Sequence, residues 1–286
     1  MTTPTPLPAG LRDRVLAAAL EARAGGRALP DVPEISPVEA FSRAADAFLG
    51  LLTALPAGAW GTPVLRDLDV QGLVGHLAGV EEDVQRALDG DPDVAEADHV
   101  GSTQPAAERE VGRSPEDTRR TWRAAAERTL ARVRGADLDA VVRLHGMRLR
   151  LGAQLVVRAF ELWTHENDIR RVAELPASVP DAATLRLMTD LAVRLLPHGV
   201  ARVADDVPPA DVHLVLTGAG GGTWDVVLGK RTAGTVVSDV GIVADAVRFC
   251  RLVADRIGPA ALGAHVTGAA AIASTVLTGA AALALD

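Results

Sequence analysis

The sequence predicts a mainly α chain with a C-terminal α+β domain. Apolar residues recur every three or four positions through most of residues 37–205, which is typical of helices. Beyond Pro208-Pro209 the apolar residues alternate with polar ones, which is typical of strands. We therefore divide the chain into an N-terminal extension with a short helix (1–36), a helix bundle (37–205) and a C-terminal α/β domain (206–286). A length of 286 residues also favours more than one domain.

Composition excludes several classes of protein. A formal net charge of -8 and the lack of a polybasic run argue against nucleic-acid binding. The single cysteine, Cys250, excludes an intrachain disulfide and indicates a reducing, cytoplasmic setting. Residues 2–9 lack the apolar core of a secretory signal. Residues 257–285 carry no Asp, Glu, Lys or Arg, but Pro259 and several glycines interrupt them, so we expect a buried strand and helix and no membrane span.

The first half of the chain reads as a series of helices. Residues 10–24 form a short amphipathic pattern that Gly25-Gly26 ends, and residues 38–55 carry an apolar face. An irregular link around Trp60 leads to a helix over residues 67–88, and Gly72 and Gly79 on that helix allow a close approach by another segment.

The middle of the chain is less regular. Residues 91–113 are acidic and without periodicity, which predicts a long loop and leaves a role as a lid open. Ser114-Pro115 begins a helix that we expect to reach Arg134. Alternation over residues 137–151 predicts a short extended excursion, and residues 181–200 form the last long helix of this half.

The C-terminal part alternates in the manner of strands. We expect strands over residues 211–217, 223–229 and 235–239, a helix over 242–257, a short strand over 265–267 and a helix over 269–277. The glycine run 218–222 joins two strands and lacks a following Gly-Lys-Ser/Thr, so it predicts a wide hairpin turn and no phosphate loop. Cys250 falls on a helical pattern that buries it.

Two residues on one helix suggest a metal site. Glu161 and His165 are four residues apart in a helical pattern, so both side chains rise from one face. His76 lies on the apolar side of its own helix and offers a third ligand, while His145 is a weaker candidate for a fourth. The same spacing also occurs in solvated polar pairs of scaffold proteins. Phe160 and Trp163 indicate partial burial, where an unpaired carboxylate and imidazole would be costly.

Two segments carry a family resemblance. Trp60 with Leu68-Asp69-Val70-Gln71-Gly72-Leu73-Val74-Gly75-His76-Leu77-Ala78-Gly79, followed by Arg158-Ala159-Phe160-Glu161-Leu162-Trp163-Thr164-His165-Glu166-Asn167-Asp168, resembles the mycothiol-dependent maleylpyruvate isomerase family. The resemblance covers roughly residues 37–286. It implies a DinB-like metal-binding helix bundle followed by a small sterol carrier protein-like domain. It further implies that His76, Glu161 and His165 bind Zn²⁺ or another divalent metal, and that Arg256 is a catalytic arginine.

The resemblance also implies a chemistry. Two imidazoles and one carboxylate leave a position on zinc open, which is the arrangement of a reactive site. Mycothiol, a low-molecular-weight thiol of actinobacteria, would be activated there to attack an electrophilic small molecule. The outcome is cis-trans isomerisation if the thiol leaves again, or S-transfer if it stays. Asp168, one turn beyond His165, would either orient a ligand or the thiol or be only a polar residue at the end of the helix. A non-catalytic protein of the same fold that binds a metal and a small molecule remains the alternative.

Overall fold

The computed structural model describes residues 32–231 and 236–284. The helix expected over residues 10–24 lies outside these residues. The chain from Pro33 to Asp286 forms one compact unit. The division at residues 205 and 206 therefore stays a prediction. None of the helices in the described parts of the chain has the length and apolar character needed to cross a membrane.

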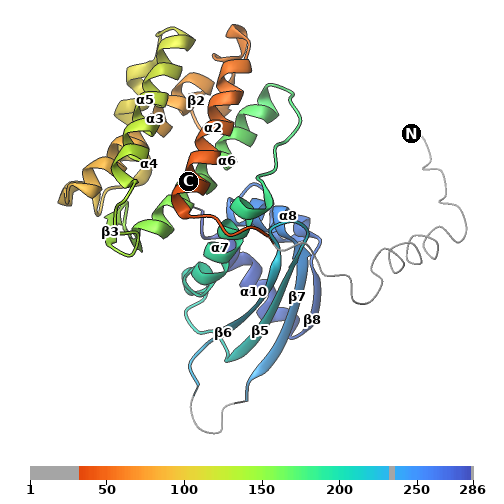
Figure 1. Ribbon diagram of the computed structural model, residues 1–286. Helices are drawn as coiled ribbons and strands as arrows, with labels where there is room; N and C mark the ends of the chain where they lie inside the picture. Colours follow the sequence, from red (N-terminus) through yellow and green to blue (C-terminus); the bar gives the residue numbers. More distant parts are fainter. Residues whose placement is uncertain (1–31, 232–235, 285–286) are drawn as a thin grey trace, which may run out of the picture. The chain divides into compact units, whose positions relative to one another are not determined.

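Long helices in the first half form a bundle (Figure 1). They are α2 (Pro37–Ala54), α3 (Val70–Leu88), α5 (Pro115–Val133) and α6 (Leu151–Val172). The first three begin at side-chain caps, because Ser36, Asp69 and Ser114 accept hydrogen bonds from backbone amides in the first turn. Their apolar faces meet in one core, whose large members are Phe41, Phe48, Leu73, Leu77, Trp122, Leu155 and Leu162.

The link before α3 anchors the start of that helix. It contains the short helix η1 (Ala57–Ala59) and the strands β1 (Pro63–Leu65) and β2 (Leu68–Asp69). Trp60 is buried, and its carbonyl accepts a hydrogen bond from the Gln71 amide at 3.0 Å. The irregular link around Trp60 thus leads into the helix that carries His76, as expected.

The expectation of a long loop over residues 91–113 is wrong. The segment contains the short helix η2 (Pro92–Val94) and the helix α4 (His99–Glu110), which packs along α3. A Cβ added at Gly79 of α3 would lie 2.7 Å from the Cβ of Ala106, so only glycine permits this approach. The same holds at Gly75, where the Ala106 carbonyl oxygen would lie 2.9 Å away. An anchored helix, and no free lid, therefore covers this side of α3.

A hairpin precedes α6, as the alternation over residues 137–151 predicts. Its strands are β3 (Val141–Leu144) and β4 (Met147–Arg150). His145 in the turn has a φ of 50°, and its amide donates to the carbonyl of Val94 at 2.9 Å. The turn is thereby fixed against the segment that leads into α4.

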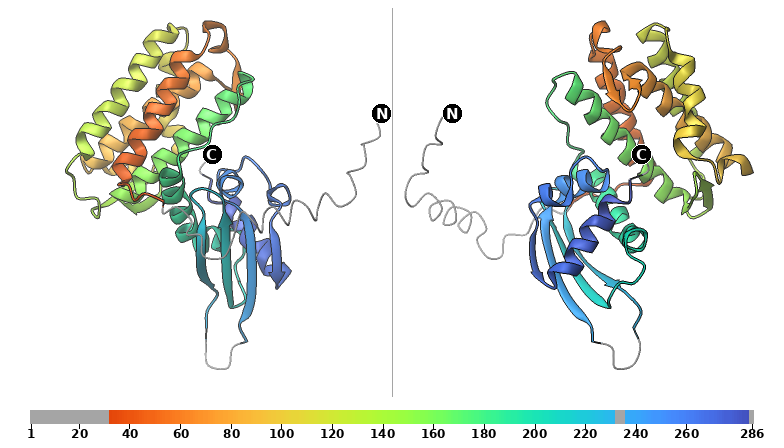
Figure 2. Two further views of the ribbon diagram at one scale, coloured as in Figure 1. Left: turned by 45° about the vertical axis from the view of Figure 1, so that its right-hand side comes forward. Right: turned by 180° about the vertical axis from the view of Figure 1, so that it is seen from behind.

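A mixed sheet occupies the last part of the chain (Figures 1 and 2). After α7 (Ala182–Val203), its strands stand in the order β6-β5-β7-β8, and only the β5–β7 pair is parallel. The strands are β5 (Ala210–Thr217), β6 (Gly222–Leu228), β7 (Ser238–Asp245) and β8 (His265–Gly268). The helices that follow β7 are α8 (Ala246–Val253), α9 (Pro259–Leu262) and α10 (Ala270–Ala281). The hairpin turn at the glycine run is confirmed.

The boundary between β7 and α8 differs from the expectation. Residues 242–245 belong to β7, so the helix expected from Ile242 begins at Ala246. Val240, Ile242 and Ala244 alternate into the core, and the Asp245 side chain then caps α8 by accepting from the Arg248 amide. Cys250 on α8 is wholly buried, as expected.

A second core joins one face of the sheet to α7, α8 and α10. It unites the inward residues of the strands with apolar side chains of these helices, including Leu196, Val200, Phe249, Val276 and Leu277. The helices α7 and α10 approach closely at two glycines. A Cβ added at Gly199 would lie 2.1 Å from the carbonyl oxygen of Gly279.

Gly199→Ala is therefore expected to destabilise the fold by about 2–3 kcal/mol, because a rigid backbone oxygen occupies the place of the new methyl group. The matched control is Gly50→Ala on α2, where a Cβ meets nothing within 4 Å. That control should stabilise by about 0.5–1 kcal/mol through helix propensity. Urea denaturation followed by circular dichroism measures both, and equal stabilities for the two variants would contradict the close helix crossing.

Candidate metal centre

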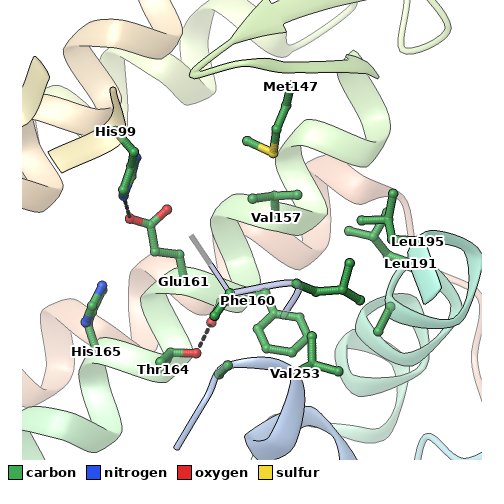
Figure 3. A pocket seen from close by; sticks show the side chains of 14 residues that line it. His99, Met147, Val157, Phe160, Glu161, Thr164, His165, Leu191, Leu195 and Val253 are labelled. Carbon is green, nitrogen blue, oxygen red and sulfur yellow. Dashed lines mark hydrogen bonds and ion pairs between the residues drawn. The ribbon is translucent and has the colours of Figure 1, made fainter. Parts of the chain in front are cut away.

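Three side chains from two helices converge on one buried spot. His76 comes from α3, and Glu161 and His165 come from α6; their ligand atoms all lie within 4.8 Å of one another. The side chains are 2%, 12% and 1% exposed. The structure thus brings together the residues that the sequence predicts as ligands. Figure 3 shows Glu161 and His165 on the same face of α6.

Hydrogen bonds on the far side of each imidazole set its tautomer. His76 Nδ1 lies 2.7 Å from Thr103 Oγ1, and that hydroxyl donates its own proton to the His99 carbonyl at 2.8 Å. The hydroxyl therefore accepts from His76, so Nδ1 carries the hydrogen and Nε2 carries a lone pair. Likewise, His165 Nδ1 lies 3.1 Å from Asp168 Oδ2. A carboxylate only accepts, so His165 also keeps its lone pair on Nε2.

Hydrogen bonds from His165 and Arg256 keep Asp168 ionised. Burial alone would raise its pKa, but the hydrogen bonds from His165 and Arg256 outweigh burial and lower the pKa to about 2. Arg256 binds it in a bidentate manner, with Nε 2.9 Å from Oδ1 and Nη2 2.8 Å from Oδ2. This is the pattern of outer carboxylates that orient metal-binding histidines.

Glu161 is oriented by a buried arginine. Arg158 is 0% exposed and donates through Nη1 to Glu161 Oε2, while its Nε and Nη2 donate to Glu81 Oε1 at 3.0 and 2.9 Å. Burial favours the neutral carboxyl group, yet the positive charge of Arg158 prevails and holds the pKa of Glu161 well below its usual range. The other oxygen, Oε1, is left facing the imidazoles.

The facing atoms fit a cation. Glu161 Oε1 and His76 Nε2 lie 3.6 Å apart, and neither has a hydrogen-bond partner among the described residues. Burial lowers the pKa of His76 to about 4, so its Nε2 holds no proton at neutral pH. Two buried acceptors without a proton between them repel each other. Tetrahedral zinc, with bonds of about 2.0–2.1 Å, separates its ligand atoms by roughly 3.4 Å, so the donor set and the spacing of this pair suit the metal.

A third imidazole reaches the same carboxylate. His99 Nε2 lies 3.4 Å from Glu161 Oε1, and Figure 3 shows the two side chains pointing toward each other. Behind it, His99 Nδ1 lies 3.0 Å from His145 Nδ1, and His145 Nε2 lies 3.0 Å from Asp83 Oδ2. With Asp83 accepting from His145 Nε2, a neutral His145 accepts at Nδ1 from His99, which places the lone pair of His99 on Nε2.

These contacts change the roles that the sequence suggests for His145 and His99. His145, the candidate for a fourth ligand, directs one nitrogen at Asp83 and the other at His99, and it lies outside the ligand group. His99 has no place in the sequence prediction, because residues 91–113 were expected to form a loop. The available signal was the spacing of His99 and Thr103, four residues apart on one face of α4.

A cavity of about 110 Å³ opens beside the ligands (Figure 3). His99, Glu161, Thr164 and His165 supply its polar wall. The remaining wall is apolar and comes from β4, α6, α7, α8 and the last described residues, namely Met147, Val157, Phe160, Leu191, Ala192, Leu195, Val253, Ala254, Leu283 and Ala284. A small molecule in this cavity would lie against the candidate metal site.

Arg256 lies at a second cavity. This cavity of about 370 Å³ is lined by Arg171, Arg251 and Arg256 together with Trp163, Asn167 and Asp168. The Arg256 side chain is 22% exposed and does not line the first cavity. The structure thus connects Arg256 to the candidate metal site through Asp168 and His165.

A family model matches part of this chain, and solved structures resemble the fold of most of it. Residues 41–170 match the family model described as the mycothiol maleylpyruvate isomerase N-terminal domain. A crystal structure of the mycothiol-dependent maleylpyruvate isomerase matches with a TM-score of 0.54 and 12% identity, over 77% of this chain and 88% of that chain. A histidine-to-alanine mutant of that isomerase matches over the same shares with a TM-score of 0.53 and 12% identity. No curated protein matches this chain in sequence.

His165→Ala is expected to remove most of the bound divalent metal and to leave helix content nearly unchanged, because apolar faces hold the bundle together. The control is His213→Ala, which removes an exposed histidine on β5. Elemental analysis of protein purified without chelators gives metal per chain, and circular dichroism gives helix content. Stoichiometric metal in the His165 variant would show that the ligands lie elsewhere.

Proposed function

We propose that this chain, whose residues 41–170 belong to the mycothiol maleylpyruvate isomerase N-terminal domain family, is a metal-dependent enzyme that activates a thiol of mycothiol type. The thiol would attack an electrophilic small molecule, giving cis-trans isomerisation or S-transfer. The observation that carries the proposal is the set of buried acceptor atoms of His76, Glu161 and His165 at the wall of a cavity.

The charges around the candidate site favour an anionic ligand once a metal is bound. Arg158 lies between two carboxylates, Glu81 and Glu161, which leaves one net negative charge in this buried group. The imidazole of His76 is neutral at pH 7. A divalent cation therefore turns the net charge to plus one, and a thiolate then restores neutrality. Zinc bound in this way lowers the pKa of a thiol.

The proposed reaction consists of addition of the thiol followed by either elimination or protonation. Sulfur adds to one carbon of a double bond, and the electron pair of that bond moves to the neighbouring carbon. In isomerisation, the new single bond rotates, the pair returns and the thiolate leaves unchanged. In S-transfer, the neighbouring carbon takes a proton and the sulfur–carbon bond remains. His165, held by Asp168, and Glu161, held by Arg158, keep the ligand atoms in place during either course.

The reactive sulfur must come from outside the chain. Cys250 is 0% exposed, and burial raises the pKa of its thiol far above neutral pH. It is a core residue of α8 and does not line the cavity beside the candidate site. A low-molecular-weight thiol as co-substrate agrees with the reducing cytoplasm that the single cysteine suggests.

We expect turnover to require both added thiol and metal. Cys250→Ala should leave kcat/KM nearly unchanged, whereas His76→Ala should lower it by about thirtyfold or more, because a thiol of pKa about 8.5 is only about 3% ionised at pH 7. The assay incubates the metal-loaded protein with mycothiol and a panel of unsaturated acids, enones and epoxides, and follows products by mass spectrometry.

The controls separate the enzyme from its alternatives. Equal turnover without thiol would contradict the mechanism. Absence of turnover with both metal and thiol bound would identify a non-catalytic binding protein of the same fold.

Arg256 remains our candidate for a catalytic arginine, and its contacts support an action through Asp168 on His165. If so, Arg256→Ala should weaken metal affinity by about tenfold or more. The matched control is Arg251→Ala, because Arg251 lines the same cavity while the bidentate contact with Asp168 comes from Arg256. A chelator competition measures the affinity. If Arg256→Ala raised KM for a carboxylate substrate while metal affinity stayed constant, Arg256 would bind substrate directly.

A further inference from the structure

We infer that the electrophile is an uncharged molecule with a hydrocarbon body, and that it occupies the cavity of about 110 Å³ beside Glu161 and His165. This inference rests on the proposed function and specifies the class of substrate. It does not follow from the similarity to a maleylpyruvate isomerase. The composition of the cavity wall carries it.

The wall divides into a polar end and an apolar body. The polar groups are His99, Glu161, Thr164 and His165, which are all at or next to the candidate ligands. Thr164 directs its hydroxyl hydrogen to the Phe160 carbonyl at 2.9 Å. The body of the cavity is lined by side chains of Val157, Phe160, Leu191, Leu195, Val253 and Leu283. Burial of a hydrocarbon group against such a surface stabilises the complex by about 25 cal/mol per Å² of apolar surface removed from water.

The wall has no lysine or arginine among the described residues that line it. A carboxylate in the apolar body would therefore lose its hydration without gaining a cation, which costs several kcal/mol. A substrate with two carboxylates would meet this penalty wherever an acid group enters the apolar body.

The nearby guanidinium groups are occupied by protein carboxylates. Arg158 is 0% exposed and lies between Glu81 and Glu161. Arg256 lines the second cavity, where two of its nitrogens bind Asp168. Neither group is therefore placed to neutralise an acid in the first cavity. An uncharged acceptor requires no such partner.

An α,β-unsaturated aldehyde or ketone satisfies these conditions, and the addition of a thiol to it is a balanced reaction. Sulfur forms a bond to the β carbon, the π pair moves to the α carbon, and that carbon takes a proton equivalent to the one the thiol lost. No oxidant or further reactant is needed. The alkyl chain of such a molecule would lie along Val157, Phe160 and Leu195 while its reactive carbon faces the polar end.

The test compares trans-2-alkenals of increasing chain length with unsaturated monoacids and diacids of matched length, using metal-loaded protein and mycothiol. Each methylene that enters the cavity should raise kcat/KM about fourfold, from about 0.8 kcal/mol of burial. The acids should react at least about a hundredfold more slowly than the alkenals. A preference for diacids, lost in Arg251→Ala, would overturn the inference and place the substrate at the second cavity.

A variant that fills the cavity tests the location. Val157→Trp should abolish the gain with chain length while metal content and turnover of the shortest alkenal are less affected. The control is Val227→Trp, which adds the same bulk on a side chain that is 57% exposed. Unchanged chain-length dependence in the Val157 variant would contradict the assigned cavity.

A binding measurement keeps this inference distinct from the proposed function. Native mass spectrometry and displacement of the uncharged dye Nile red, on protein without thiol, report whether saturated alkanals and matched carboxylic acids bind. Binding of the alkanals alone, lost in Val157→Trp, would support the uncharged class even if no thiol-dependent turnover is found. Binding of the acids in preference would overturn it, whatever the turnover assay shows.

Discussion

The candidate centre depends on one buried guanidinium. Arg158 has no exposed surface and holds the carboxylates of Glu81 and Glu161 at once. Without its positive charge, two acidic groups would remain in the interior, and the cost of burial would drive a carboxyl group to its neutral form. Arg158 therefore keeps Glu161 anionic and turns its second oxygen toward the histidines. The net negative charge of this buried group follows from this arrangement.

The helix α4 completes that arrangement from the other side. Gly75 and Gly79 let its backbone approach α3, which brings Thr103 to His76 and His99 to Glu161. The hydroxyl of Thr103 fixes one tautomer, and the series from Asp83 through His145 fixes another. Every imidazole near Glu161 thus presents an acceptor atom. Gly75 and Gly79 have no reactive groups of their own. By allowing α4 to approach α3, they place Thr103 and His99 beside the candidate ligands.

Local spacing was sufficient to predict part of this structure. Glu161 and His165 share a helix face whatever surrounds them, and a clear apolar pattern placed His76 inside the bundle. His99 was missed because α4 is polar, contains Pro105 and owes its position to tight packing on α3. The end of β7 was misplaced because Ile242 and Ala244 fit either a strand or a helix locally, and pairing with β5 decides between them. The contact between Arg256 and Asp168 spans 88 positions, and no local pattern reports it.

That long-range pair has an evolutionary consequence, because its two members are not equivalent. Asp168 accepts from Arg256 and from His165 at the same time, whereas Arg256 needs only an acceptor. Exchanging the two residues would preserve the ion pair but set a cation beside a histidine that must donate. Loss of Arg256 alone would leave His165 its acceptor, whereas inversion of the pair would remove it, so selection for a lone pair on His165 Nε2 would keep the acid on α6.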